Sequence, residues 1–125
     1  MIVGLGVDIA DVGRVQAAIE RHGEHFLRRV FTPAEIEYCE SHRSRYERYA
    51  ARFAAKEAAM KALGTGWRRG VRWVDIEVAR EQSGKPVLRL RGAARVIADQ
   101  LGTKHIALSL THAETQALAQ VIFES

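Results

Sequence analysis

An alanine-rich segment near the middle of the chain, RYAARFAAKEAAMKALGTG at residues 48–66, constrains the fold most strongly. Alanine is the best helix former, and large apolar side chains recur among the alanines at helical spacing. These side chains are Tyr49, Phe53, Met60 and Leu63. Gly64 follows where a left-handed C-terminal cap belongs. The segment therefore predicts a helix over about residues 45–63.

Charged side chains interrupt this apolar helix. Phe53, Glu57 and Lys61 are spaced four apart, so their side chains lie along one stripe. One interpretation is an exposed Glu57–Lys61 pair, which contributes only about 0.3–0.5 kcal/mol. The other is that the surrounding alanines let a second backbone approach closely, so that partly buried charges need partners from elsewhere in the chain.

The beginning of the chain supplies such a partner. In IVGLGVDI, residues 2–9, apolar residues alternate with Gly4 and Gly6, which predicts a short strand with close backbone approach. Asp8 stands near the end of this strand, where it can meet Glu57 at the edge of a sheet. Two carboxylates completed by waters and substrate phosphates suit Mg²⁺, and Lys61 could neutralise a further phosphate oxygen.

Other kinds of site have less support. Cys39 has no second cysteine at ligand spacing and the five histidines form no HExxH motif, so zinc is rejected. The lone Cys39 thiol is interpreted as a core or surface filler rather than a nucleophile. Gly64-Thr65-Gly66 ends a helix and lacks the GK[ST] sequence, so it is not a P-loop, although its backbone amides could contact phosphate.

Two further helices and a short one are expected. The pattern from Asp11 onward predicts a helix that Gly23 ends, and residues 92–101 predict a short helix. Thr32-Pro33-Ala34-Glu35 combines a threonine cap, a first-turn proline and a capping-box glutamate, which predicts a helix that runs to about His42.

The remaining regular segments alternate as strands do. Residues 71–80 alternate through Val71, Trp73 or Val74, Ile76 and Val78, and with the segment after Ser83-Gly84 they predict a hairpin. Residues 105–112 and 115–124 predict a second strand pair with a turn at about Ala113-Glu114. The expected fold class is therefore α+β, with packed helices and antiparallel strands in one layered structure.

Composition limits the class of protein. A chain of 125 residues with 47% hydrophobic residues is expected to form one domain, residues 1–125. The start lacks the basic segment of a signal peptide, and no apolar stretch approaches the roughly 20 residues that cross a bilayer. Together with the single cysteine, this predicts a cytoplasmic protein without a membrane span.

The net charge of +4 predicts an acidic partner without saying which kind. Arginines gather in three groups, which could form a solvated face or bind nucleic acid. The groups are Arg14, Arg21, Arg28 and Arg29; Arg43, Arg45, Arg48 and Arg52; and Arg68, Arg69 and Arg72.

Four segments together carry a resemblance to a known family. They are GVDIADVGRV near the start, FAAKEAAMKALGTG in the middle, SGKPVL later, and SLTHAETQALAQVIFE at the end. In this order and spacing they resemble holo-[acyl-carrier-protein] synthase, the small 4′-phosphopantetheinyl transferase, over nearly the whole chain. The aspartate-containing start and the KExxxK stretch are the specific parts, whereas SGKP and SLTH alone are weak.

The resemblance implies a reaction. The phosphopantetheine arm of coenzyme A would move to a serine of apo-acyl carrier protein, with release of adenosine 3′,5′-bisphosphate, for fatty acid or polyketide synthesis. It implies Mg²⁺ held by Asp8 and Glu57 together with the coenzyme A pyrophosphate, and Lys61 at the phosphates. Either Glu57 or a water at the metal would accept the serine proton.

The resemblance also implies residues that line the coenzyme A site. These are Gly64, Thr65, Gly66, Lys85, Pro86, Ser109, Thr111 and His112. Lys85 or His112 would lie near the 3′-phosphate or the pyrophosphate. The alternatives are a solvated turn lysine and a structural histidine at a strand end.

The partners follow from the same resemblance. Acyl carrier proteins are acidic, and the family docks them on its first helix, which makes Arg14 and Arg21 the candidates, with Arg28 and Arg29 extending the patch. Short members of the family form homotrimers with the coenzyme A site between subunits. No membrane or nucleic-acid partner is expected.

Two hypotheses from other classes compete with the enzyme. A basic nucleic-acid-binding protein would use the arginines on phosphate and Trp67 or Trp73 for stacking, which leaves Asp8 and Glu57 unexplained. A non-catalytic oligomeric scaffold would use the KExxxK helix only as a subunit contact. Replacing Glu57 by glutamine separates the three hypotheses. The enzyme would lose turnover and keep its assembly, the scaffold would lose its assembly, and the nucleic-acid-binding protein would lose neither.

Overall fold

The structure is a computed structural model that describes residues 1–66 and 68–125. Its elements follow one another as β1 (Ile2–Asp11), α1 (Val12–His22), α2 (Glu24–Val30), α3 (Pro33–Glu40), α4 (Arg45–Leu63), the 3₁₀ helix η1 (Trp73–Asp75), β2 (Ile76–Arg80), β3 (Pro86–Leu90), α5 (Gly92–Gln100), β4 (His105–His112) and β5 (Gln116–Glu124). The α+β prediction is confirmed. Trp67, named above for base stacking, lies outside the described residues.

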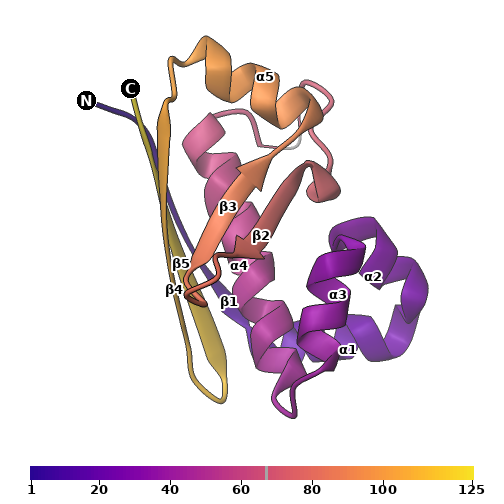
Figure 1. Cartoon of the computed structure of the whole chain (residues 1–125). Helices are drawn as coiled ribbons and strands as arrows, with labels where there is room; N and C mark the ends of the chain where they lie inside the picture. Colours follow the sequence, from indigo (N-terminus) through magenta and orange to yellow (C-terminus); the bar gives the residue numbers. More distant parts are fainter. Residues whose placement is uncertain (67) are drawn as a thin grey trace.

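An antiparallel sheet with the strand order β1-β5-β4 forms one side of the molecule. Figure 1 shows this sheet nearly edge-on, with α4 along one face and no helix on the other. The β2–β3 hairpin lies across α4, and α1, α2 and α3 gather at the end where α4 begins. Asp8 of β1 pairs with Ala119 of β5, which pairs in turn with Leu110 of β4.

Helix α4 packs directly on β1 and β5, and its alanines are almost all fully buried. A Cβ atom at Gly4 would lie 2.4 Å from the carbonyl oxygen of Ala62, so only glycine fits there. The predicted close backbone approach is confirmed. The predicted helix bounds are confirmed as well, because Gly64 ends α4 with a left-handed φ of 78°.

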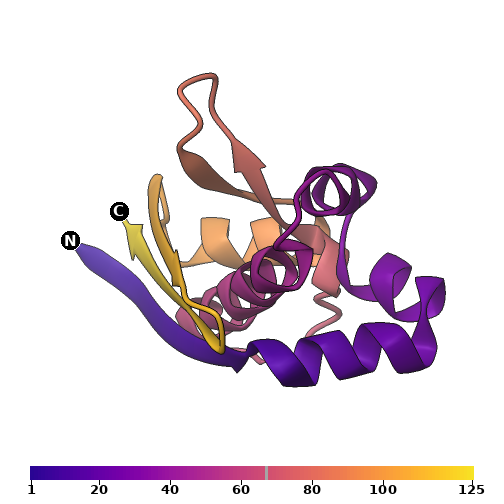
Figure 2. The same ribbon diagram turned by 90° about the horizontal axis from the view of Figure 1, so that it is seen from below.

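Helices α1 and α3 begin where the sequence predicts, and α1 ends before Gly23 as predicted, whereas α3 ends at Glu40 rather than at about His42. Asp11 caps α1 by accepting a hydrogen bond from the Arg14 amide, and Thr32 forms the capping box of α3 with Glu35. Helix α2, which turns back beside α1 (Figure 2), is not predicted. Its N-cap residue Gly23 has no side chain that could accept a capping hydrogen bond, so the sequence carries no start signal for α2.

One predicted strand is too long. The sequence predicts that Trp73 or Val74 belongs to the alternation of a strand, but both residues lie in η1, and β2 begins only at Ile76. The Asp75 carboxylate accepts a 3.0 Å hydrogen bond from the Arg72 amide, which closes a tight turn in place of strand pairing. The other elements agree: β2 pairs with β3, α5 is helical, and β4 pairs with β5.

Among the described residues, no helix combines the length and the apolar character that crossing a membrane requires.

Candidate active site

The end of β1 and the last turns of α4 bring three charged side chains together. The Lys61 Nζ lies 3.0 Å from Asp8 Oδ1 and donates a second 3.0 Å hydrogen bond to the carbonyl of Val7. Lys61 thus pairs with Asp8, across the gap between helix and strand, rather than forming the exposed pair with Glu57 that the spacing also allowed. The Asp8 side chain is only 20% exposed, so this pair is partly shielded from water.

Glu57 is the third member of this group. The side chain is partly buried, and burial is the main cause that raises its pKa above the usual value. The negative charge of Asp8 raises the pKa further, while Lys61 opposes the shift. Asp8 is thus near enough for its charge to disfavour an ionised Glu57, and Lys61, which pairs with Asp8, favours it.

This donor set fits a hard divalent cation. Over residues 1–66 and 68–125, no three histidine, cysteine, aspartate or glutamate side chains gather to hold a metal. Asp8 and Glu57 would supply two carboxylates and leave the other positions to water or substrate, as Mg²⁺ accepts and structural zinc does not.

Gly64, Thr65 and Gly66 follow α4 one turn beyond Lys61. Gly64 and Gly66 have positive φ values of 78° and 58°, and the Thr65 hydroxyl donates to the Gly66 carbonyl at 3.3 Å. The loop is exposed or partly exposed, so its backbone is open to a ligand near Lys61.

The other residues predicted to line the coenzyme A site come from the β2–β3 turn, from the start of β3 and from β4. Lys85 is exposed in the β2–β3 turn, and Pro86 pairs with Arg80. His112, at the end of β4, forms a 3.0 Å pair with Glu47, near the start of α4. No described hydrogen bond or ion pair connects these residues with Asp8, Glu57 or Lys61. Ser109 and Thr111, also on β4, are exposed.

Sequence reasoning grouped Arg48 and Arg52 with other arginines but assigned neither of them to the coenzyme A site. Arg52 is only 4% exposed, yet no described carboxylate pairs with it. Its one hydrogen bond, to the Arg48 carbonyl, is 3.5 Å long, and the Nε atoms of Arg48 and Arg52 have no partner among the described residues. A buried guanidinium without a counter-ion calls for an anion. The sequence signal for the burial of Arg52 was its position among the alanines of α4.

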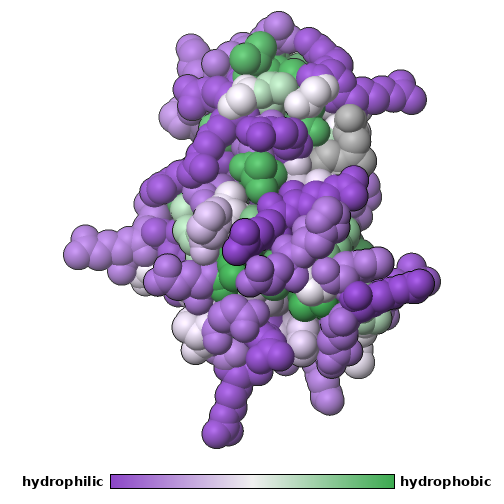
Figure 3. Space-filling view, turned by 90° about the vertical axis from the view of Figure 1, so that its right-hand side faces the viewer, coloured by the Kyte–Doolittle hydropathy of each residue, from purple (hydrophilic) through white to green (hydrophobic). Residues whose placement is uncertain are grey.

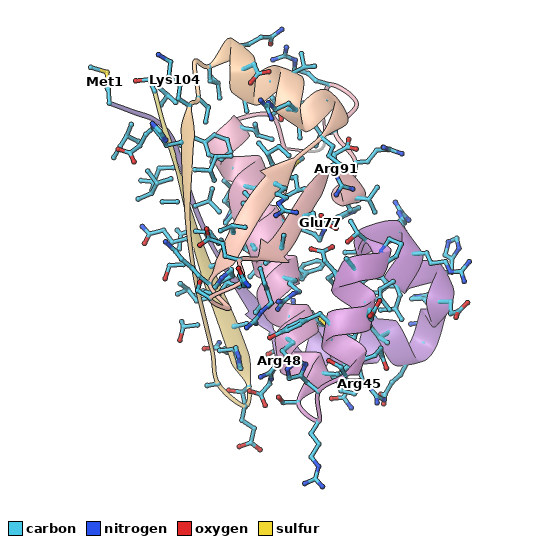
Figure 4. All side chains as sticks on the ribbon, viewed as in Figure 1. Met1, Arg45, Arg48, Glu77, Arg91 and Lys104 are labelled. Carbon is cyan, nitrogen blue, oxygen red and sulfur yellow. The ribbon has the colours of Figure 1, made fainter. Side chains whose placement is uncertain are left out.

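These arginines belong to the same end of the molecule as Lys85 and His112. The guanidinium carbons of Arg52 and Arg80 lie 4.2 Å and 4.6 Å from the centre of the Tyr38 ring. Arg80 is the last residue of β2, next to the turn that carries Lys85, and Glu47, the partner of His112, directly precedes Arg48 (labelled in Figure 4). We call Arg48, Arg52, Arg80, Lys85 and His112 the basic cluster.

The arginines predicted to bind a partner come from α1 and α2. Arg14 lines a hollow on the α1 side together with Phe26 and Phe53, and Phe53 is on the stripe that carries Glu57. Arg21 is exposed in the last turn of α1. Arg28 pairs with Glu24 and lines a different hollow, between α2, α3 and η1.

Cys39 carries no chemistry in this arrangement. Its side chain is fully buried, and burial raises the pKa of the thiol to about 12. The prediction that it fills space rather than acting as a nucleophile is confirmed for the core.

Comparisons with known proteins agree with this fold. Residues 4–121 match the family model described as the 4′-phosphopantetheinyl transferase superfamily. The chain is 58% identical, over 125 residues and all of both chains, to a holo-[acyl-carrier-protein] synthase of Solibacter usitatus.

Solved structures give the same result. The crystal structure of holo-[acyl-carrier-protein] synthase from Neisseria meningitidis has a TM-score of 0.90 and 33% identity, covering 100% of both chains. A holo-(acyl-carrier-protein) synthase from Bacillus anthracis, in complex with CoA (3′,5′-ADP), has a TM-score of 0.81 and 35% identity, covering 100% of this chain and 98% of that one.

Proposed function

This chain belongs to the holo-[acyl-carrier-protein] synthase family of the 4′-phosphopantetheinyl transferase superfamily, and from this premise we propose its reaction and site. The enzyme moves the 4′-phosphopantetheine group of coenzyme A to a serine of an acidic apo-acyl carrier protein and releases adenosine 3′,5′-bisphosphate. The reaction depends on Mg²⁺ and serves fatty acid or polyketide synthesis. An enzyme of this family is neither a passive scaffold nor a protein whose purpose is to bind nucleic acid.

The convergence of Asp8, Glu57 and Lys61 carries this proposal. Asp8 and Glu57 would hold Mg²⁺, and the ion would neutralise negative charge on the pyrophosphate and on the transferred phosphoryl group. Lys61 Nζ, 3.0 Å from Asp8, is close enough to bind a phosphate oxygen of the substrate. Displacement at phosphorus needs chiefly such positioning and charge neutralisation.

The serine hydroxyl also needs a proton acceptor. Lys61 is a cation, and the Asp8 carboxylate is already paired with it. Glu57 is the remaining carboxylate of the group, so either this side chain or a water at the metal would accept the serine proton. The Gly64-Thr65-Gly66 loop, one turn from Lys61, contributes backbone amides to the same phosphates.

The basic cluster is the second anion site, for the 3′-phosphate of coenzyme A. Arg48 and Arg52 lack a described counter-ion, and a phosphate would supply one. Arg52 precedes Glu57 by five residues, which places the two side chains about 140° apart around α4. One coenzyme A molecule cannot easily reach both faces of the same helix. We therefore assign the basic cluster and the metal site that bind one coenzyme A molecule to neighbouring subunits.

A homotrimer provides these neighbours. On the uncovered face of the sheet, Leu5, Val7 and Ile9 of β1 are 55%, 49% and 57% exposed. By contrast, the face that carries α2 and α3 is mostly hydrophilic, with small hydrophobic areas (Figure 3). Contact between copies through the uncovered sheet face buries these apolar side chains and brings the exposed Ser109 and Thr111 of β4 to the interface.

The carrier protein docks on the α1 side. Arg14 lies beside the hollow that Phe26 and Phe53 line, and Phe53 precedes Glu57 by one turn on the same stripe of α4. A carrier bound there presents its serine toward the metal site. Arg14 and Arg21 attract the acidic carrier over a longer range.

The test is intact-mass spectrometry of an apo-acyl carrier protein incubated with this protein, coenzyme A and Mg²⁺. We expect a mass gain of one phosphopantetheine that EDTA abolishes and that Glu57→Gln slows by at least about 100-fold. Asp99→Asn, which also replaces a carboxylate by an amide but at an exposed position of α5, is the matched control and keeps full activity. No gain with several folded apo-carriers would overturn the proposed function.

A further inference from the structure

Lys56, the residue directly before Glu57, is completely buried. Its Nζ lies 2.8 Å from Oε1 of Glu35 on α3, and neither side chain is exposed at all. Burial lowers the pKa of Lys56, and the charge of Glu35 is the main opposing influence. Removing one partner of such a pair leaves the other charge buried without compensation.

The ammonium group of Lys56 also binds two backbone carbonyls. It donates to the carbonyl of Ile76, the first residue of β2, and, at 3.2 Å, to the carbonyl of Trp73 in η1. With Glu35, these contacts occupy all three N–H groups of the ammonium. One side chain of α4 is therefore attached to α3, η1 and β2 at once.

Glu35 is itself held rigidly. Its Oε1 accepts from the Thr32 amide at 2.9 Å, and its Oε2 accepts from the Val78 amide at 2.8 Å. The Thr32 hydroxyl donates to Glu77, which pairs with Arg91 at 2.7 Å (Figure 4). The partner of Lys56 thus belongs to a connected polar network that joins α3 to β2 and to the residue before α5.

The consequence concerns the direction of Glu57. Successive residues of a helix point about 100° apart, so fixing Lys56 on one side of α4 fixes the direction of Glu57 on another. The Trp73 carbonyl bonded by Lys56 belongs to a residue whose ring stacks on Phe53, 5.0 Å between centroids, one turn before Glu57. The contacts of Lys56 therefore constrain the stripe of α4 that carries Glu57, the proposed metal ligand.

We propose that Lys56 is a positioning residue, whose ammonium group fixes the rotation of α4 against α3, η1 and β2 and so holds Glu57 toward Asp8. This inference rests on the proposed function of Glu57. It assigns to Lys56 no contact with substrate. It explains why a fully buried charge stands beside the metal ligand in an alanine-rich helix.

The test uses the double variant Lys56→Met/Glu35→Gln, which removes both charges and leaves neither one buried alone. We expect kcat to fall by about 10- to 100-fold and the Mg²⁺ concentration for half-maximal rate to rise by about tenfold. The KM for coenzyme A should stay within about twofold, because neither residue belongs to the basic cluster. Rates are measured below the melting temperature of every variant.

Ile97→Ala, in the buried side of α5, is the control for lost stability. Its rates are compared with those of the double variant at equal distance below each melting temperature. If Ile97→Ala loses as much kcat and needs as much Mg²⁺, or if the double variant keeps both values, the positioning role is overturned while the wild-type enzyme still transfers.

Binding of Mn²⁺ alone, followed by its electron paramagnetic resonance signal, gives a readout independent of transfer. We expect about tenfold weaker binding by the double variant and unchanged binding by Ile97→Ala. Equal affinity in all three proteins overturns the proposal. If the wild-type protein shows no transfer, the proposed function fails, and the Mn²⁺ comparison still decides whether Lys56 positions the carboxylates.

Discussion

A Cβ atom at Gly6 would lie 1.8 Å from the carbonyl oxygen of Ala58, because β1 and α4 pack backbone against backbone at this point. The same contact sets how far Asp8, two residues later on β1, lies from Glu57, which directly precedes Ala58. The spacing of the proposed metal ligands thus depends on a residue without a side chain.

Replacing Gly6 by alanine should therefore damage both stability and activity. The new methyl group meets backbone that cannot rotate away, so we expect a loss of about 3 kcal/mol or more in the free energy of unfolding. Urea unfolding measures this loss. Gly13→Ala, inside α1, is the control, because its Cβ would meet only the Asp11 side chain at 3.1 Å. A Gly6→Ala protein as stable as Gly13→Ala would contradict the expectation.

Glu57 should make the stability of the metal-free protein depend on pH. Its pKa in the folded state is raised above the usual 4.5, chiefly by burial, so the folded protein binds this proton more tightly than the unfolded chain. The ionised carboxylate therefore costs stability, a cost that is absent below 4.5 and complete once the pH exceeds the folded pKa.

In EDTA at neutral pH, Glu57→Gln should consequently melt above the wild-type protein, and the difference should vanish as the pH falls below 4.5. Circular dichroism melting curves across the acid range measure it, with Asp99→Asn as the control. A glutamine variant that melts lower at neutral pH would mean that Glu57 is stabilised rather than strained by its surroundings.

Arg52 should discriminate between coenzyme A and its form without the 3′-phosphate. If the basic cluster binds that phosphate, Arg52→Met raises the KM for coenzyme A by about 10- to 100-fold, the range for hydrogen bonds to charged groups. The KM for dephospho-coenzyme A should hardly change. Steady-state kinetics with both substrates measure the effect. Equal changes for the two substrates would show that Arg52 supports only the fold.

Val7 should contribute to assembly. Its side chain is 49% exposed on the uncovered face of the sheet, and an aspartate there would place a charge in the proposed subunit contact. We expect Val7→Asp to shift the mass measured by light scattering from a trimer to a monomer at micromolar concentration. Val96→Asp, at an equally exposed position of α5, should leave the mass unchanged. A wild-type monomer would refute the homotrimer directly.

Arg14 and Arg21 should act on the carrier protein alone. Exposed ion pairs contribute up to about 1 kcal/mol each, so replacing either by alanine should raise the KM for the carrier by up to about fivefold. The increase should shrink at high salt, because screening weakens the same attraction in the wild-type protein. Arg89→Ala, exposed on β3, is the control. An unchanged KM for the carrier would move the docking surface away from α1.

Much of this fold follows from local sequence signals. The caps at Thr32 and Gly64 and the alternation of β4 and β5 depend only on neighbouring residues, and the structure confirms them. Helix α2 lacks such a signal, because Gly23 makes no side-chain cap. In segment 73–75 the local signal is misleading. Its apolar alternation predicts a strand, but the hydrogen bonds of the Asp75 side chain hold a 3₁₀ turn instead.

The sequence by itself determined that Asp8, Glu57 and Lys61 could meet, because glycines on a strand and alanines on a helix permit close contact. Only the tertiary structure decided that Lys61 pairs with Asp8 rather than with Glu57, that Lys56 is buried against Glu35, and that Arg52 lacks a described counter-ion. Periodicity and caps are properties of adjacent residues, whereas burial and ion pairing depend on segments that only folding brings together.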